Sequence, residues 1–446
     1  MSVVVHFNRE MGNLVPDSRW RRNIAVLLSV LFAAGMLLYV RRVLVPYQRA
    51  DAAAHDHPRG NLSDLYPRWL GARELLLHGR DPYGPDITRE IQMGYYGRVI
   101  HPSRPGDPRD QQAFAYPVYI VFPLAVLIYL PFEIIRVAFY GFLIAVVAAT
   151  LLLWLRALPW RPRKSSTVIL LLLLLGNLPV IQAIELQQLT LVVGLLLAIC
   201  AVLLARGDFG LAGIALATAT IKPQLTIPLA AWLTLWALSR WGQRKNFVWG
   251  FYPTLGILFL AGEWILPGWV SKFLHAVAAY QQYTQASSVL DHLSNAQWGP
   301  ILSAAVLVIV VILCWHFRRE PEKSAAFMAI FSLVIAATLV TEPSVSTYNQ
   351  ALLLPAALIV LKSAASLWNR NLPARLIWLL AAGVLVWPWI SAFVLAVASF
   401  VLSAARVQAA WKLPFYTSLA IPFAVLGLLF QYIFRIIATE PVAELD

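Results

Sequence analysis

The sequence predicts an all-α membrane protein that crosses the bilayer many times, and two features of composition support this first. Hydrophobic residues make up 60% of the 446 residues and charged residues only 13%, whereas an ordinary soluble domain holds about 25% charged residues. The mean hydropathy is +0.69. A soluble domain could not keep so much apolar surface from water. We therefore expect one membrane domain, residues 23–446, after a polar segment, residues 1–22, with no collagen-like, disordered or disulfide-scaffold character.

The third observation is a series of apolar runs, since about 20 such residues cross a bilayer. We expect about 11–13 transmembrane helices. The runs are 23–40, 133–155, 167–183, 189–205, 209–221, 223–239, 246–265, 298–317, 324–341, 348–364, 374–387, 389–405 and 413–434. The pairs 209–221 with 223–239 and 374–387 with 389–405 are interrupted at Lys222-Pro223 and at Pro388. Each pair forms either two short helices or one long kinked helix.

Basic residues indicate the orientation of these spans. Arg19, Arg21 and Arg22 precede the first run, which no small-residue cleavage site follows, so we expect an uncleaved span with a cytoplasmic N-terminus. If residues 41–132 remain outside, nearly every short basic connection falls inside: 156–164, 206, 240–245, 318–323, 369–375 and 406–412. This explains the net charge of +13 as a membrane signal and not as a nucleic-acid site. It also requires residues 117–131, with three prolines, to be interfacial or re-entrant.

The first external loop is unusually long and acidic. Between residues 41 and 113 it holds nine of the 22 acidic residues, and structureless loops of this length are uncommon unless they have a function. One stretch has helical spacing of its apolar residues, Leu65, Trp69, Ala72, Leu75 and Leu76. We expect an amphipathic helix in the outer interface, capped by Asn61 or Ser63, ended by Gly79 and followed by a turn at Asp81 to Gly84.

The second external loop, residues 266–297, has a similar interfacial pattern. Phe273, Leu274, Val277 and Tyr280 are spaced to share one helical face. We therefore expect a second interfacial helix there.

Two residues are the strongest candidates for chemistry. Asp64 begins the first interfacial helix, where the helix dipole favours an ionised carboxylate able to accept a proton, although an acid at this position also serves as a simple cap. Lys222 interrupts an apolar stretch, and a lysine at that depth costs about 2.5–3.5 kcal/mol. Its alternatives are contact with an anionic lipid headgroup or a lysine that extends to the interface.

Three further polar groups fall on the same predicted side. They are Glu185 with Gln187 and Gln188, Thr341 to Ser344 with Tyr348, and Asp291 with His292, Ser294 and Asn295. Singly each is an ordinary loop, but together they favour an active cavity at the outer surface.

Other chemistries have little support. His55-Asp56-His57 has no further ligand cluster close by, so we expect a solvated loop and no metal site. The chain has no Asp-x-Asp pair, P-loop, Gly-x-Gly-x-x-Gly or Gly-x-Ser-x-Gly motif. This disfavours metal-dependent nucleotide-sugar enzymes, ATPases, dinucleotide enzymes and α/β hydrolases.

The order of several short motifs resembles the GT-C type of membrane glycosyltransferase, and more narrowly glycosyltransferase family 87, the polyprenyl-phosphate-mannose-dependent mannosyltransferases. The stretch from Asp64 to Gly79-Arg80-Asp81-Pro82-Tyr83 resembles the family's acid, amphipathic helix and Gly-x-x-Pro-Tyr. The later motifs are Phe114-Ala115-Tyr116-Pro117, Gln188-Leu189-Thr190, Arg206-Gly207-Asp208, Ala212-Gly213, Lys222-Pro223 and Glu342-Pro343-Ser344. The chain has Gln187, Val118 and Glu342 where the family pattern has glycine, proline and serine.

The resemblance implies a GT-C bundle and an inverting transfer from a polyprenyl-phosphate sugar, with mannose the commonest sugar, to a lipid-linked or glycan acceptor at the outer face of the plasma membrane. It implies Asp64 as general base, without a metal or other cofactor. It implies contacts to the donor phosphate from Lys222, Arg68, His292 and Gln188. It implies further substrate contacts from Tyr83, Tyr116, Glu342 and Tyr348.

Two alternatives remain open at this point. A transporter or flippase for a lipid-linked saccharide would distribute charges through its cavity from side to side. An O-antigen ligase or polymerase would have its large external loop late in the chain, whereas here the largest follows the first span.

Overall fold

A computed structural model describes residues 19–54, 62–101, 103–104, 107–158, 160–285, 287–295, 297–343, 345–368 and 371–439. Throughout these ranges the chain forms helices joined by turns, without a β-strand. Six of the described helices are long and apolar enough to cross a membrane, or seven if one bent pair counts as a single span. The chain is therefore an all-α polytopic membrane protein, as its composition predicts.

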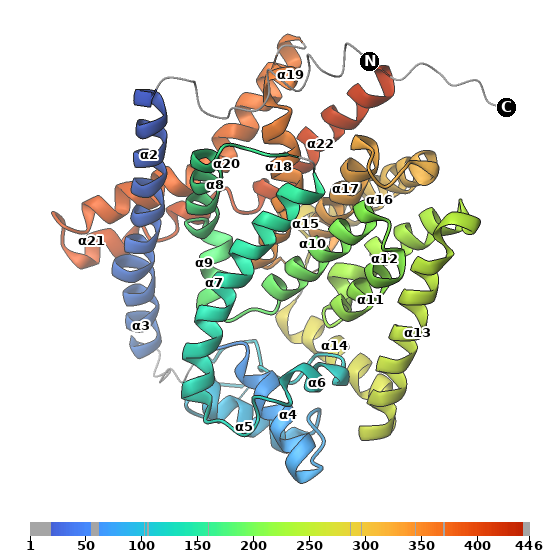
Figure 1. Ribbon diagram of the computed structural model, residues 1–446. Coiled ribbons are helices and arrows are strands. Elements are labelled where there is room, and N and C mark those ends of the chain that lie inside the picture. Colours follow the sequence, from blue (N-terminus) through green and yellow to red (C-terminus); the bar gives the residue numbers. More distant parts are fainter. Residues whose placement is uncertain are drawn as a thin grey trace.

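The N-terminal third contains one long span, the helices of the first loop and a second span. It comprises α2 (Arg19–Tyr39), η1 (Val40–Leu44), α3 (Val45–Ala54), α4 (Tyr66–His78), α5 (Pro85–Tyr96), η2 (Val118–Ile120), α6 (Val121–Leu124) and α7 (Phe132–Ala157). Helices α4 and α5 lie together at the lower end of the molecule in Figure 1, with the end of α3 above them.

The middle third is built from shorter helices. It comprises α8 (Lys164–Leu175), α9 (Leu178–Glu185), α10 (Thr190–Arg206), α11 (Phe209–Ala219), α12 (Pro223–Leu238) and α13 (Trp241–Ile265). Helices α8 and α9 are bent by 59° at their junction. The Lys222-Pro223 interruption separates α11 from α12, so the first uncertain pair forms two short helices.

The C-terminal third begins with the segment expected to form the second external loop. It comprises α14 (Trp269–Thr284), α15 (Val289–Leu293), α16 (Trp298–His316), η3 (Phe317–Arg319), α17 (Ala325–Thr341), η4 (Thr347–Leu353), α18 (Leu354–Lys362), α19 (Ala364–Trp368), α20 (Leu372–Ala398), α21 (Ala404–Ala409), η5 (Leu413–Phe415) and α22 (Ala420–Thr439). Pro388 lies inside α20, so the second uncertain pair forms one long helix.

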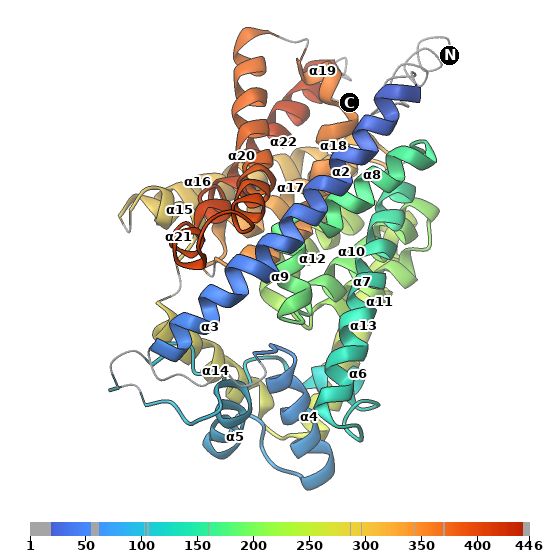
Figure 2. The ribbon, with the colours of Figure 1, turned by 90° about the vertical axis from the view of Figure 1, so that its left-hand side faces the viewer.

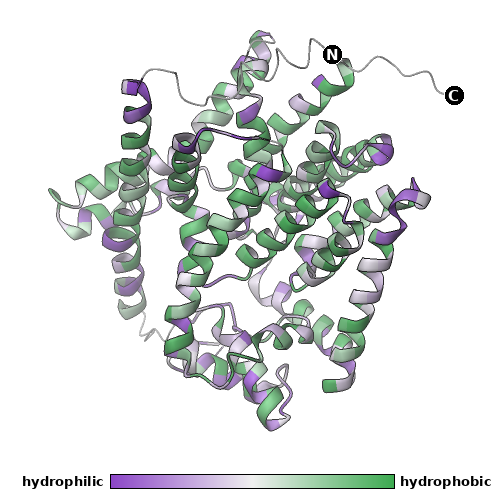
Figure 3. Cartoon of the chain, viewed as in Figure 1, coloured by the Kyte–Doolittle hydropathy of each residue, from purple (hydrophilic) through white to green (hydrophobic). Residues whose placement is uncertain are grey.

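Helix α17 is the centre of the bundle. Every residue from Ala326 to Val340 is buried. The longer helices around it instead expose large apolar side chains, such as Leu260 and Trp264 of α13 and Leu380 of α20. Figures 2 and 3 show long, largely apolar helices through the body of the molecule, with more polar residues towards the two ends. Only a lipid environment accommodates such an exposed apolar surface.

The first loop forms the predicted helix, α4, with differences in detail. Helix α4 ends at Gly79, which adopts the left-handed conformation with φ 66°, as predicted. Before its N-terminus the Ser63 hydroxyl accepts from the backbone N–H of Leu65 at 3.3 Å and also donates to Gln187, while Leu65, the residue that precedes the helix, provides no side-chain cap; Asn61 lies outside the described residues. Helix α4 is buried on more than one face, including Leu70 and Glu74, so it packs against the rest of the protein.

The proline-rich segment is irregular, as predicted. Residues 117–131 form only the short helices η2 and α6 and a series of turns. Val118, Tyr119 and Ile120 are buried. This segment does not form a helix of spanning length.

The short helices position the candidate functional residues, because several of these helices begin or end beside the same cavity. Helix α11 has 11 residues, about 16 Å at 1.5 Å per residue and half the hydrocarbon thickness of a bilayer. Residues at the starts of α4 and α12 and at the end of α17 line one cavity.

Candidate functional site

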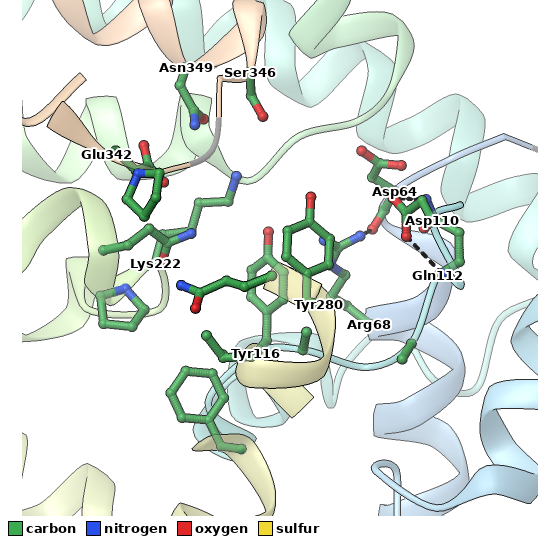
Figure 4. Close-up of a pocket in the computed structure, with 18 of the residues that line it drawn as sticks. Asp64, Arg68, Asp110, Gln112, Tyr116, Lys222, Tyr280, Glu342, Ser346 and Asn349 are labelled. Atoms are coloured by element: carbon green, nitrogen blue, oxygen red, sulfur yellow. Dashed lines mark hydrogen bonds between the residues drawn. The ribbon is translucent and has the colours of Figure 1, made fainter. Parts of the chain in front are cut away.

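A cavity of about 340 Å³ opens between the first loop, the start of α12, α14 and the connection after α17. Figure 4 shows side chains from all these segments directed towards it. Its polar lining residues are Asp64, Arg68, Asp110, Gln112, Tyr116, Lys222, Gln224, Tyr280, Gln281, Glu342, Ser346, Tyr348 and Asn349. The cavity thus brings together Asp64, Arg68, Tyr116, Lys222, Glu342 and Tyr348 of the predicted site residues.

Asp64 is held in place by the turn between α9 and α10. Its backbone N–H donates to the carbonyl oxygen of Leu186 at 2.8 Å. The neighbouring Ser63 hydroxyl donates to Oε1 of Gln187, whose Nε2 donates to the carbonyl of Arg136 at 2.7 Å. Gln187 has a φ of 55°, a conformation that favours glycine. Its two side-chain hydrogen bonds compensate for this backbone strain and fix the loop that carries Asp64.

The Asp64 carboxylate accepts two side-chain hydrogen bonds. Tyr95 donates to Oδ1 at 3.1 Å and Gln188 Nε2 donates to Oδ2. Burial raises the pKa of this carboxyl above its ordinary value, while the charge of Arg68 and the hydrogen bond from Tyr95 act in the opposite direction. The result is a carboxylate with reduced solvation and increased basicity.

Lys222 is linked to Asp64 through the Gln188 side chain, which is hydrogen-bonded to both. Its side chain is only 4% exposed. Nζ donates to Gln188 Oε1 at 2.9 Å and to Thr190 Oγ1 at 2.7 Å. Thr190 in turn donates to Asn349 at 2.8 Å. The rings of Tyr348 and Tyr116 lie 5.2 and 5.9 Å from the ammonium, within the range of cation–π attraction.

Arg68 and two tyrosines form the wall next to Asp64. The Arg68 guanidinium lies 4.2 Å from the centroid of the Tyr116 ring and donates to the main-chain oxygen of Asp64. Tyr83, which was expected to contact substrate, does not line this cavity. Its hydroxyl donates to the carbonyl of Tyr116 at 2.5 Å and so supports the wall from behind.

Two further carboxyls line the cavity. Burial raises the pKa of Glu342, at the end of α17, to about 7, although Lys222 lowers it in part. Burial also raises the pKa of Asp110 to about 6, although its hydrogen bond from the backbone of Gln112 acts to lower it. Glu342 was among the predicted site residues, whereas Asp110 was counted with the nine acids of the first loop and was not predicted to belong to the site.

The role of the apolar face in the second loop was missed. Phe273, Leu274, Val277 and Tyr280 do share a face of α14, as predicted, but this face lines the cavity. Asn349 was also missed, because only the structure shows that it lines the cavity and accepts a hydrogen bond from Thr190.

Other polar groups from the sequence lie elsewhere. His292 is on α15, outside the cavity, and its Nε2 is 2.9 Å from the hydroxyl of Ser287. Asp291 forms a capping box with Ser288. Glu185 accepts from Tyr140 at 3.3 Å. His55, Asp56 and His57, together with Ser344, lie outside the described residues.

Comparison with known proteins gives one match. The sequence model of glycosyltransferase family 87 matches residues 114–343, just over half of the chain. This range includes Tyr116, Gln188, Lys222 and Glu342 of the cavity network. No curated protein and no solved structure gives a significant match.

Proposed function

The chain belongs to glycosyltransferase family 87, and we propose that it moves a sugar, mannose by family resemblance, from a polyprenyl-phosphate carrier to a lipid-linked or glycan acceptor at the outer face of the plasma membrane. A glycosyltransferase needs a sugar donor and an acceptor, and the cavity offers chemistry suited to both. Family membership leaves no support for the flippase alternative.

One observation carries the proposal. The amide of Gln188 is hydrogen-bonded to the carboxylate of Asp64 at one end and to the ammonium of Lys222 at the other. It places a base and a cation in one cavity at a fixed separation. A carboxylate and an ammonium suit glycosyl transfer from a phosphate carrier, because a proton leaves the acceptor hydroxyl and negative charge develops on the departing phosphate.

The proposed step is a single displacement. The Asp64 carboxylate accepts the proton of the acceptor hydroxyl as its oxygen bonds to the anomeric carbon. The bond from that carbon to the phosphate oxygen breaks, and its electron pair leaves with the polyprenyl phosphate. Attack opposite the leaving group inverts the anomeric configuration.

Lys222 is well suited to the leaving phosphate. An ammonium has three N–H donors, and Gln188 and Thr190 use two of them. The third is available for a phosphate oxygen. Lys222 also precedes the first turn of α12, and the positive end of that helix dipole favours an anion nearby. Arg68 supplies a second cation on the Asp64 side.

A second cavity suits the prenyl tail. It holds about 500 Å³ and is lined almost entirely by apolar side chains from residues 120–142, α10 and the end of α11. Leu189 and Ile221 line it, and they are the chain neighbours of Gln188 and Lys222. A donor whose phosphate contacts Lys222 therefore has an apolar groove within reach for its tail.

The test is transfer by the purified full chain from a radiolabelled polyprenyl-phosphate mannose to a membrane glycolipid fraction. Loss of a general base lowers turnover by about 10²–10⁴-fold, so Asp64→Asn should do so while the protein stays folded. Asp208→Asn, an exposed aspartate before α11, is the matched control and should retain full activity. Normal turnover by Asp64→Asn would refute the proposal, as would transfer only from a diphosphate-linked donor.

A further inference from the structure

A second polar groove adjoins the candidate active site. It lies between the turn before α5 and the far side of α14, with a volume of about 920 Å³, more than twice that of the cavity that holds Asp64. Both volumes fall in the range of small-molecule sites. The side chains that define it are Asp81, Tyr83, Thr88, Arg89, Gln111, Phe114, Ser271, Lys272, His275 and Tyr283.

The groove and the cavity share a wall. Ala113 lines both of them. Helix α14 presents Phe273, Val277 and Tyr280 to the cavity, and on its other face Ser271, His275 and Ala279 line the groove. The two spaces therefore adjoin at Ala113, on either side of α14.

The groove combines aromatic rings with uncharged hydrogen-bonding groups. Tyr83 and Phe114 pack edge to face with ring centroids 5.2 Å apart, and the Tyr283 ring lies further along. Aromatic rings can pack against the C–H faces of a sugar ring. The Tyr283 hydroxyl is buried and has no hydrogen-bond partner among the described residues.

The polar groups offer both donors and acceptors. His275 Nδ1 is 2.7 Å from the carbonyl oxygen of Ser271, so in the neutral ring Nδ1 carries the proton and Nε2 is an acceptor. The Ser271 hydroxyl can act in either direction, whereas the Thr88 hydroxyl donates to the carbonyl oxygen of Gly84 at 3.1 Å and remains an acceptor. Sugar hydroxyls, which also donate and accept, match this set.

The charges in the groove are largely paired. Lys272 Nζ lies 2.8 Å from Asp81 at the groove, and Arg89 is paired with Asp86. A site for phosphate would show an excess of cations, and a site for lipid would be apolar. The groove shows neither feature and instead suits a neutral, hydroxyl-rich ligand.

We propose that this groove binds the part of the acceptor remote from the reacting hydroxyl, and that the acceptor is an oligosaccharide of several sugar units whose terminal unit enters the cavity. This inference rests on the proposed transferase function and adds the size and chemical class of the acceptor.

The first test measures saccharide binding and does not depend on transfer. In A279C the new thiol lines the groove, whereas in A278C an exposed thiol on the same helix lines neither space. The native Cys200 and Cys314 are buried. The probes are gluco-, manno- and arabino-oligosaccharides of one to four units, and the readout is the rate of labelling by a soluble maleimide.

A bound saccharide should slow labelling of A279C by about tenfold at about ten times its Kd, because only the free protein reacts. Protection should increase with the number of sugar units, and A278C should react at an unchanged rate. If no saccharide protects A279C, or if A278C is protected equally, the groove assignment is wrong.

The second test links the groove to transfer. The S271A/H275A double variant should lose the preference for longer acceptors that the groove predicts for the wild type, measured as the ratio of kcat/KM for a tetrasaccharide to kcat/KM for a monosaccharide. Retained preference in this variant would overturn the inference. Saccharide protection without any transfer would instead reject the proposed function and leave the groove assignment standing.

Discussion

At the scale of single residues, Gln188 determines how the candidate site is organised. Its amide has a donor end and an acceptor end. The Nε2 end faces the Asp64 carboxylate and the Oε1 end faces the Lys222 ammonium. The opposite orientation would place acceptor against acceptor and donor against donor, so the two charges fix the amide and the amide fixes the spacing of the charges.

Removal of this amide should change the pH dependence of activity. The hydrogen bond from Gln188 lowers the pKa of Asp64 against the larger effect of burial, which raises it. In Gln188→Ala the pKa of Asp64 therefore rises further, and the fraction of ionised base at neutral pH falls. We expect the acidic limb of kcat/KM to move to higher pH, and at a given pH on that limb kcat/KM should fall about tenfold for each unit by which the pKa of Asp64 rises. Gln182→Ala on α9 is the control, and an unshifted limb in Gln188→Ala would contradict the linkage.

Glu342 should make donor binding depend on pH. Burial raises the pKa of its carboxyl to about 7. Below this pH the neutral carboxyl leaves the charge of Lys222 free for a phosphate, whereas above it the carboxylate neutralises that charge and repels the donor. We expect the donor KM to rise as pH increases through about 7, and Glu342→Gln to remove the rise. The exposed Glu133→Gln should keep the wild-type profile, and a donor KM in Glu342→Gln that still rises would refute this role.

Sequence alone identifies the candidate residues that interrupt or end an apolar run. Lys222, Gln188 and Glu342 stand out because a polar group there has a desolvation cost that needs an explanation. Asp110 lies in a polar loop, where nothing in the sequence distinguishes it from the other acids. Only folding shows that its carboxyl points into the cavity.

At the scale of helices, the close crossing of α11 and α13 fixes the position of the break at Lys222, between α11 and α12. A Cβ added at Gly250 would lie 2.0 Å from the carbonyl oxygen of Gly210, and one added at Gly213 would lie 2.4 Å from that of Phe247. Side chains at these positions would separate the helices. Because α11 leads directly to Lys222, its position determines where the ammonium lies.

The Gly250→Ala variant should therefore be destabilised by about 1–3 kcal/mol, the usual cost of overpacking. Gly256→Ala lies on the same helix with no atom within 4 Å of the added methyl, so it should be neutral or stabilising by up to about 1 kcal/mol. The measurement is thermal unfolding of both variants in one detergent. Equal stability of the two variants would show that the crossing is not tight.

The outcome for α14 shows a limit of pattern reasoning about helices. Its apolar face was correctly predicted, but an apolar face looks the same whether it meets lipid or a cavity. Here that face forms one wall of the cavity with Asp64, and the opposite face forms a wall of the polar groove. The sequence could not distinguish these environments, because they depend on residues more than 150 positions earlier in the chain, such as Ala113.

At the scale of the whole molecule, hydropathy predicts the class of the fold better than its number of spans. Runs such as 133–155 and 298–317 became the long helices α7 and α16. Others became α10, α11 and α17, which have between 11 and 17 residues. Neighbouring helices enclose α17 along its length, so it need not match the bilayer thickness, and the expected count of about 11–13 spans includes several of these short helices.

The predicted orientation concerns the charges near the two ends of the molecule. In Figure 1 the start of α2, the connection from α7 to α8 and the start of α13 lie in the upper half, and α4, α5 and α14 lie in the lower half. The upper segments carry Arg19, Arg161 and Arg240, whereas basic residues near α4 and α5 are accompanied by acids, as Arg80 is by Glu74 and Glu90. Basic residues concentrate on the cytoplasmic side of membrane proteins, so the end with Asp64 should face outwards.

Single-cysteine labelling on spheroplasts tests this orientation. Arg161 is exposed at the basic end and Met93 of α5 is 52% exposed at the opposite end. Both native cysteines are buried, so they provide a low background. A membrane-impermeant maleimide should label M93C in intact spheroplasts and R161C only after permeabilisation, because the bilayer blocks the charged reagent. The reverse pattern would place Asp64 in the cytoplasm. An acceptor glycan outside the cell could not reach it there, so transfer at the outer face would be excluded even if the cavity chemistry were correct.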